Sequence, residues 1–429
     1  MKQLSLTTLF IIAILLSPSC AKLEKYSDSP ENQILKKESS VIPVKEALAR
    51  LQEFYGKGDV KSSSTSKIIK DIFVVYDSSP ETKSLSTDTL LYVVNYIDES
   101  GYVILPADEN IPEDVLLISE TGNVSPSSFY TNTALLIDSV LKYSNPKNDN
   151  CIIGGEPDEA ESFILQQVAH YASVTMRENN GAYSDTDDNV SIHGDRDTWN
   201  IPINQRTWKD TMVNVLMSTQ WHQRSPYNDN VPSGRYAGCV PIAIAQIMAY
   251  NEYPENLSIN DTPIVWSRMT ETKNIEEGSV SAQMAAHLIR YIQRSCDSWI
   301  FKQGTFTFPQ KAEKFLKDMG YKNVTRSTSY SEDVVLASLA NKYPVFLAGA
   351  QNHNVFKSHG WVVDGWFRYM RYYDLQDKKS GKIVASHTDV THYLHCNWGN
   401  NNTGWVVSGV FNSGSSTYNT WYRMITYTL

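Results

Sequence analysis

The spacing of hydrophobic positions changes along the chain. Residues 44–54 carry apolar side chains three or four positions apart, which predicts an amphipathic helix, and residues 164–175 repeat this pattern. Between them, two runs rich in β-branched and aromatic residues flank Asp98-Glu99-Ser100-Gly101, which predicts a β-hairpin. The first part of the chain is therefore predicted to be a small α+β unit.

A polar, acidic stretch, "ENNGAYSDTDDNVSIHGDRD", interrupts the hydrophobic pattern. Such a stretch predicts an exposed linker of the kind that proteases cut, with a long ordered surface loop as the alternative. From about Trp199 to Leu429, aromatic residues, glycines and β-rich runs dominate. The pattern predicts four parts, which are a signal at 1–20, a first domain at 21–177, a linker at 178–198 and a second domain at 199–429.

The first twenty residues resemble an export signal. Lys2 gives a basic start, Leu9 to Leu16 is continuously apolar, and Cys20 follows Ser-Pro-Ser. The apolar run is too short to span a membrane. A cysteine at this place resembles a bacterial lipoprotein signal, in which the cysteine becomes the lipidated first residue. We expect export from a bacterial cell, as an outer-membrane or cell-surface lipoprotein or as a secreted protein.

Charge and cysteine content narrow the class of protein. The 429 residues exceed one ordinary core, and 38 basic against 47 acidic side chains give a net charge of −9. This acidity argues against nucleic acid as the main partner. Beyond Cys20 there are four cysteines, whose wide spacing fits neither a disulfide framework nor a paired metal site. These four are Cys151, Cys239, Cys296 and Cys396.

Cys239 has a position that suits a nucleophile. It precedes the run of small and apolar residues in "AGCVPIAIAQ", and Pro241 fits the first turn of a helix. Unpaired backbone N–H groups and the macrodipole at a helix N-terminus favour an anion, which lowers a thiol pKa. A small buried core cysteine fits the same position.

Further residues could complete the chemistry of a cysteine nucleophile. The nucleophile needs a base, and His359 begins the β-rich run "SHGWVVDGWF". Asn397 or Trp398, at the end of another run, could orient the imidazole. Gln223 could donate its amide to a developing oxyanion.

Four motifs together resemble the streptopain family of papain-like cysteine peptidases, which bacteria export as zymogens. The motifs "WHQRSPYN", "AGCVPIAIAQIMAYNEYP", "SHGWVVDGW" and "NWG" occur in the order and spacing of that family, from about Gln220 to the C-terminus. The earlier stretch "LLYVVNYIDESGYVILPADENIP" is similar, more weakly, to the family's inhibitory propeptide.

The resemblance implies a role for each candidate residue. Cys239 would be the nucleophile, His359 the general base and acid, and Gln223 the oxyanion-hole glutamine acting with the Cys239 N–H. Trp398 matches the active-site tryptophan that shields and holds the histidine ring. In an extended run Asn397 and Trp398 point to opposite faces, so Trp398 is favoured and Asn397 stays open. No cofactor or metal is implied, and the partners would be protein or peptide substrates and the chain's own propeptide.

The implied fold is α+β. A small α+β propeptide would precede a papain-like domain in which the Cys239 helix packs on a twisted antiparallel sheet bearing His359. Ser358 and Asn400 depart from the family pattern, which has a glycine and a second tryptophan there, and this puts substrate preference in doubt. Two other classes stay open: a catalytically silent surface lipoprotein that binds a partner, and a transglutaminase-like or amidase relative.

The remaining candidates have structural interpretations. His392 and His395 lie on opposite faces of a predicted strand, so they are not expected to share a metal. Cys396 is predicted to pack in the core, and Cys296 to lie near a helix end. Asp364 is five residues from His359 on the same β-rich run, with its side chain on the opposite face, so a structural role at a turn is predicted rather than that of a triad acid.

Overall fold

The computed structural model describes residues 40–56, 67–77, 89–129, 153–155, 159–181, 200–302, 304–351, 358–411 and 420–429. The predicted signal with Cys20, as well as Cys151 and positions 182–198 of the predicted linker, lie outside these residues. Residues 40–429 group into one compact unit. No helix in the described ranges is long and apolar enough to cross a membrane.

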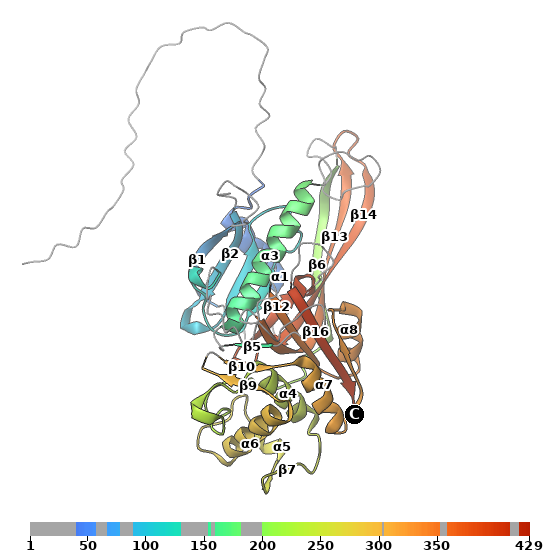
Figure 1. Cartoon of the computed structure of the whole chain (residues 1–429). Helices are drawn as coiled ribbons and strands as arrows, with labels where there is room; N and C mark the ends of the chain where they lie inside the picture. The colour runs from blue at the N-terminus through green and yellow to red at the C-terminus, as the bar shows by residue number, and fades with distance from the viewer. Residues whose placement is uncertain are drawn as a thin grey trace, which may run out of the picture. The chain divides into compact units, whose positions relative to one another are not determined.

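The described chain contains both helices and strands, with runs of consecutive strands near its two ends (Figure 1). The helices are α1 (Val44–Tyr55), α3 (Glu159–Gly181), α4 (Cys239–Asn251), α5 (Trp266–Met269), α6 (Val280–Ser295), α7 (Pro309–Asp318) and α8 (Glu332–Ala340). The strands up to α5 are β1 (Ile69–Tyr76), β2 (Thr89–Tyr96), β3 (Tyr102–Pro106), β4 (Leu117–Ser119), β5 (Ile153–Gly155), β6 (Asn200–Val213), β7 (Ser258–Ile259) and β8 (Thr262–Pro263). Those after α6 are β9 (Trp299–Phe301), β10 (Gly304–Thr307), β11 (Lys322–Ser327), β12 (Val345–Gln351), β13 (Ser358–Asp377), β14 (Ile383–Asn397), β15 (Thr403–Val407) and β16 (Thr420–Thr428).

In the first part of the chain, the segments with helical or strand periodicity form the predicted helices and hairpin. The helical spacing at 44–54 forms α1, and that at 164–175 lies within α3. The predicted hairpin forms from β2 and β3, which pair in antiparallel register. Because α3 runs to Gly181, the first four positions of the predicted linker are helical.

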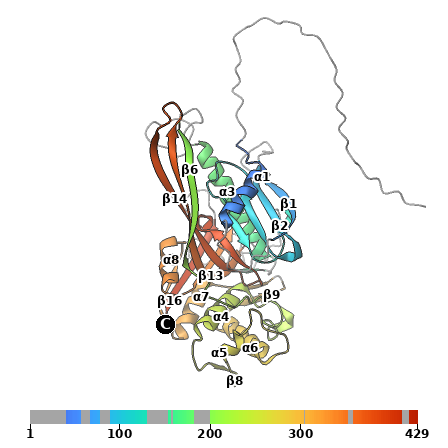
Figure 2. The same cartoon turned by 180° about the vertical axis from the view of Figure 1, so that it is seen from behind.

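One antiparallel sheet joins the two ends of the chain. Its order is β1-β2-β3-β4-β15-β14-β13-β12-β16-β11, and β6 pairs with the second half of β13. The junction lies between β4 and β15, where Trp405 pairs with Ile118. Figure 2 shows β6, β13 and β14 running together as a long ribbon. The N-terminal strands therefore extend the sheet that carries His359.

Two hydrophobic cores lie on opposite faces of β12 and β13. One core contains Leu347 and Trp361 and joins them to α1, α3 and the N-terminal strands. The other contains Phe346 and Val362 and joins them to α4, α6 and α7. Alternate residues of a strand face opposite sides, which explains why neighbours belong to different cores. The predicted α+β class is confirmed, with the Cys239 helix packed on the antiparallel sheet that bears His359.

Candidate active site

Cys239 is the first residue of α4, as the sequence predicts. Gly238 precedes it with φ of 92°, a conformation that a glycine adopts without strain. The helix lies against β13, and the N–H of Gly360 donates a hydrogen bond to the Cys239 thiol. Gly360 directly follows His359, so the fold brings the beginning of α4 to the beginning of β13.

His359 is held by a backbone carbonyl. Its Nε2 lies 2.6 Å from the carbonyl oxygen of Trp398. A carbonyl can only accept, so Nε2 must donate, and Nδ1 is then left with a lone pair that can accept a proton. The ring stacks on Trp361 with an interplanar angle of 10° and a centroid distance of 6.1 Å. Both contacts fix the orientation of the imidazole.

The two groups are shielded from water in the full-length chain. Cys239 and His359 are each 2% exposed. Burial raises the pKa of the Cys239 thiol to about 11, although the N–H groups of Gly360, Val240 and Cys239 itself lower it. Burial lowers the pKa of His359 to about 4, against a smaller upward effect of the bond to Trp398. Both groups are therefore neutral near pH 7, which differs from the thiolate predicted from helix position because desolvation exceeds the effect of the N–H groups.

Trp398 and Asn397 contact their surroundings differently from the prediction. Trp398 meets His359 through its main-chain oxygen, while its indole packs against Trp361 at a centroid distance of 5.5 Å. The ring that stacks on His359 is that of Trp361, which was not predicted as a site residue. Trp361 lies two residues from His359 on one strand and so shares its face, a signal that was available in the sequence.

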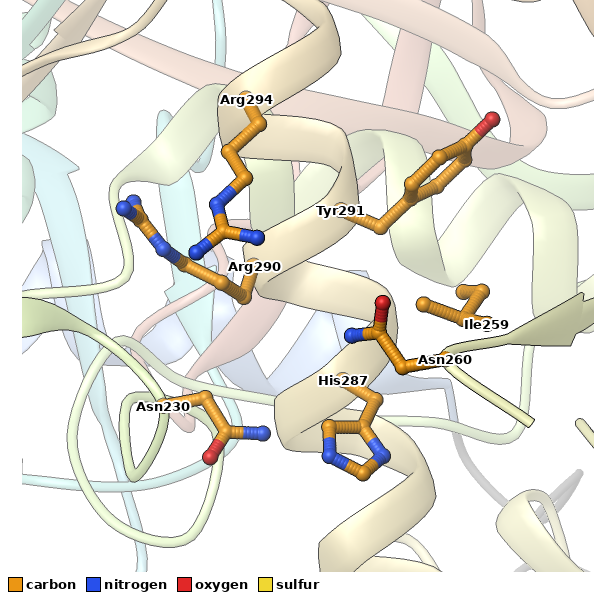
Figure 3. A pocket seen from close by; sticks show the side chains of 7 residues that line it. All are labelled: Asn230, Ile259, Asn260, His287, Arg290, Tyr291 and Arg294. Atoms are coloured by element: carbon orange, nitrogen blue, oxygen red, sulfur yellow. The ribbon is translucent and has the colours of Figure 1, made fainter. Parts of the chain in front are cut away.

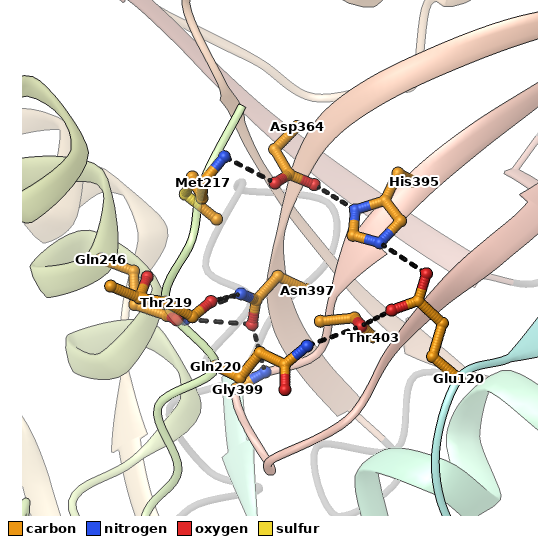
Figure 4. A network of polar contacts seen from close by, with 10 residues as sticks. All are labelled: Glu120, Met217, Thr219, Gln220, Gln246, Asp364, His395, Asn397, Gly399 and Thr403. Carbon is orange, nitrogen blue, oxygen red and sulfur yellow. Dashed lines mark hydrogen bonds and ion pairs between the residues drawn. The ribbon is translucent and has the colours of Figure 1, made fainter. Parts of the chain in front are cut away.

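Asn397 forms a buried amide pair with Gln246 of α4 (Figure 4). Its Nδ2 also donates to the Thr219 carbonyl at 2.5 Å, and its Oδ1 accepts the N–H of Gly399. The Oε1 of Gln246 in turn accepts the N–H of Trp221 at 3.0 Å. Asn397 thus positions the segment that leads to Gln223 rather than the imidazole.

Gln223 lies beside the residues that precede Cys239. Its carbonyl accepts the N–H of Ala237 at 2.9 Å, two residues before the thiol. The side chain is 2% exposed, and its Oε1 is buried without a hydrogen-bond partner among the described residues. A buried amide with unused hydrogen-bonding capacity at this place is suited to bind a polar group that enters the site.

A second polar chain in Figure 4 connects the N-terminal part to the C-terminal part. Gln220 donates to the Thr403 hydroxyl at 3.1 Å, and Thr403 donates to Glu120 at 2.9 Å. Glu120 also lies 3.8 Å from His395, whose Nδ1 is 2.6 Å from Asp364. Burial lowers the pKa of His395, but Asp364 and Glu120 raise it by more, so the net shift is upward.

The prediction that Asp364 lies at a turn is wrong. Asp364 lies inside β13 at an irregular register between Val363 and Gly365, not at a turn. Its carboxylate accepts a hydrogen bond from the backbone N–H of Met217 and another from Nδ1 of His395. Which residue faces Asp364 depends on this irregular register, and residue spacing does not reveal it.

The short strand β5 lies beside the candidate pair. It pairs antiparallel with β10, with Gly154 opposite Phe306, and it contacts α4, β12 and β13. The Ser358 hydroxyl lies 3.1 Å from the Gly154 nitrogen and 3.0 Å from its oxygen. Ser358, where the family pattern has glycine, therefore holds a strand from the N-terminal part next to His359.

Helix α3 reaches His359 indirectly, through Trp361. Phe163 of α3 packs on Trp361 at a centroid distance of 5.9 Å, and Trp361 stacks on the imidazole. A Cβ placed on Gly349 would lie only 3.0 Å from the Phe163 ring, so that ring fills the space that the glycine leaves. Two N-terminal elements thus lie next to the site, since α3 contacts Trp361 and β5 contacts Ser358.

The other residues selected from the sequence have structural surroundings. Cys296 follows α6 and Cys396 lies in β14, and both are buried free thiols. His222, which precedes Gln223 in the motif "WHQRSPYN", is partly buried, and its Nδ1 accepts the N–H of Arg224. Within the described residues no group of histidine, cysteine and acidic side chains is arranged to hold a metal ion.

Comparison with known proteins identifies the class. The model of the Peptidase C10 family matches residues 221–405, a segment that contains Gln223, Cys239, His359, Asn397 and Trp398. The segment is therefore that of a cysteine-type peptidase. It belongs to the Peptidase C10 family, which confirms the resemblance seen in the sequence. No curated protein matches the chain.

Two solved structures from Prevotella intermedia are similar to the chain. A fragment of prointerpain A is 18% identical, covers 83% of this chain and 98% of its own, and has a TM-score of 0.49. The active wild-type interpain A cysteine protease is 20% identical, covers 50% of this chain and 93% of its own, and has a TM-score of 0.37.

Proposed function

We propose that the chain is the zymogen of a cysteine endopeptidase that hydrolyses peptide bonds in proteins. The observation that carries this proposal is the meeting of Cys239 with the His359 segment inside the matched family segment. The carbonyl of Trp398 fixes the imidazole so that Nδ1 keeps its lone pair. Nucleophilic catalysis by a thiol requires a base within reach, and His359 directly precedes the Gly360 N–H that contacts Cys239, which supports this pairing.

The reaction would be acyl transfer to water. His359 takes the proton of Cys239, and the thiolate forms a bond to the peptide carbonyl carbon. The oxyanion accepts hydrogen bonds from the Gln223 amide and the Cys239 N–H. His359 then gives its proton to the leaving amine, and the C–N bond breaks. Water, deprotonated by His359, attacks the thioester and releases the acid and the thiol.

We propose that residues 40–181 keep this site inactive. Three observations support inhibition: α3 packs over Trp361, β5 lies between β10 and the His359 strand, and both catalytic candidates are neutral and buried. A substrate would need the space beside β10 and Ser358 that β5 fills. Cutting between about Glu178 and Thr219 would allow this cover to separate.

Replacing Cys239 tests the peptidase function. Full-length Cys239→Ser should not shorten itself, and after cutting in the linker its casein cleavage should fall at least about 10³-fold, because the nucleophile is lost. The matched control is Cys296→Ser, which removes another buried free thiol outside the site. Labelling by an epoxysuccinyl inhibitor should require Cys239 and survive the control substitution.

The opposite outcomes have clear meanings. If the cut, reduced protein neither labels at Cys239 nor cleaves casein, the peptidase function is wrong and a binding role for the fold is favoured. If Cys239→Ser matures normally with no other protease present, self-processing is wrong.

We also propose export with a lipid on Cys20. This rests on the basic start, the apolar run and the cysteine of residues 1–20. Cells fed a palmitate analogue should label the protein, and Cys20→Ala should lose the label and leave the membrane fraction. Label retained by Cys20→Ala would contradict lipidation at this residue. If the lipid is present, cutting the linker would release the peptidase segment from the membrane.

A further inference from the structure

We infer that a pocket on α6 binds a doubly charged tetrahedral oxyanion, either a free ion such as phosphate or the phosphate group of a larger ligand. Figure 3 shows the pocket, which encloses about 580 Å³ of space partly open to solvent. Its lining comes from α6, from the turn between β7 and β8, and from the loop before α4. The lining residues are Asn230, Ile259, Asn260, His287, Arg290, Tyr291 and Arg294.

The two arginines give the pocket its charge. Arg290 and Arg294 are four residues apart on α6, and Figure 3 shows both guanidinium groups on the same side of the helix. Among the described residues neither forms an ion pair. Like charges at this spacing destabilise a helix, and the chain as a whole is acidic with a net charge of −9. A bound anion would remove this repulsion.

The other polar lining residues suit an oxyanion. His287, one turn before Arg290 on α6, has a buried Nδ1 with no hydrogen-bond partner among the described residues. Asn230 and Asn260 bring amide groups that can donate. The lining contains no carboxylate that would repel an anion. Guanidinium groups present paired N–H donors whose geometry matches tetrahedral oxyanions, and two of them favour a dianion.

The positive charge of Arg290 is not compensated by a nearby acid. Burial lowers the pKa of Arg290, and Arg294 lowers it further, with no carboxylate opposing either effect. The Nη1 of Arg290 donates to Gln293 at 3.0 Å, so most of its donors stay available. Gln293 donates in turn to the carbonyl of Ala237 at 2.8 Å. The pocket therefore lies two side-chain contacts from the backbone that precedes Cys239.

Thermal unfolding of the full-length protein tests the site. Inorganic phosphate at tenfold its dissociation constant should raise the midpoint by about 2 °C over chloride at equal ionic strength. The double variant Arg290→Gln/Arg294→Gln should lose this rise, and Arg290→Gln alone should weaken phosphate binding about tenfold in calorimetry. The matched control is Arg268→Gln on α5, which removes one exposed positive charge outside the pocket and should keep the full rise.

Three results would overturn the site: no rise with phosphate, an equal rise in the double variant, or an equal rise with acetate. A phosphoserine peptide titrated in the same way separates the two sources of the anion. Binding of this peptide assigns a phosphorylated ligand, and binding of phosphate alone assigns a free ion. None of these measurements depends on peptidase activity, so failure here leaves the proposed function untouched.

Discussion

Cys239 in the full-length protein is expected to react with iodoacetamide at pH 7 about 300-fold more slowly than an exposed model thiol. The physical reason is the raised pKa of about 11. Only the thiolate reacts, and at pH 7 a thiol of pKa 11 is ionised about one part in 10⁴, against about one in 30 for an ordinary thiol. Shielding from the reagent would slow the reaction further.

The pH dependence follows from the direction of the shift. A raised thiol pKa moves ionisation to higher pH, so the rate should rise about tenfold per pH unit until it levels near pH 11. His359, with its pKa lowered to about 4, stays neutral throughout and adds no step above pH 5. The rate is read at each pH by mass spectrometry of the Cys239 peptide, with a model thiol peptide in the same tube.

Cys296 is the internal control for this measurement. Burial raises its pKa to about 12, and it lies directly after α6. Its rate should stay below that of Cys239 at every pH up to 10, where the protein must also keep its native circular dichroism. A plateau for Cys239 by pH 8 would mean that the full-length chain already holds a thiolate, and the proposed inactive state would be wrong.

Local hydrophobic patterns predict many of the helices and strands, because helix and strand periodicities depend on residues that are neighbours in the sequence. The 44–54 spacing gives α1, and the run around residues 98–101 gives the β2–β3 hairpin. Cys239 begins its helix because Gly238 and Pro241 define that end. These features could be predicted because the residues that determine each of them lie within about ten positions of one another in the sequence.

The surroundings of the site could not be read in this way. His359 is oriented by the main-chain oxygen of Trp398, and a main-chain atom leaves no signature in residue type. Pairing of Val362 with Asn397 decides which loop reaches the imidazole, and that register spans distant parts of the sequence. The neutral state of Cys239 depends on burial by tertiary packing, which outweighs the local effect of the helix end.

We expect β5 to contribute to the burial of Cys239. Gly154→Val should therefore raise the Cys239 alkylation rate of the full-length protein at pH 7 by up to about 300-fold. A Cβ at position 154 would lie 2.3 Å from the Thr305 carbonyl oxygen and 2.7 Å from the Phe306 Cα, both backbone atoms that cannot move aside cheaply. The strand must therefore leave β10. Water then reaches Cys239, and its pKa falls towards the ordinary value.

Two further variants distinguish exposure of Cys239 by loss of β5 from general destabilisation of the protein. Gly56→Ala places a methyl group in open space after α1, at φ of 79°, so it strains the N-terminal part without touching β5 and should leave the alkylation rate unchanged. Ser358→Ala removes both contacts to Gly154 without adding bulk, and should raise the rate in the same direction by a smaller factor.

The outcome decides which element keeps the site closed. A rise in Gly154→Val and Ser358→Ala, with unfolding midpoints no lower than that of Gly56→Ala, assigns the closure to β5. Since α3 and its Phe163 contact to Trp361 remain in both variants, that rise would also show that α3 alone does not suffice. An unchanged rate in a folded Gly154→Val protein would mean that β5 is dispensable, and the inhibitory role would pass to α3.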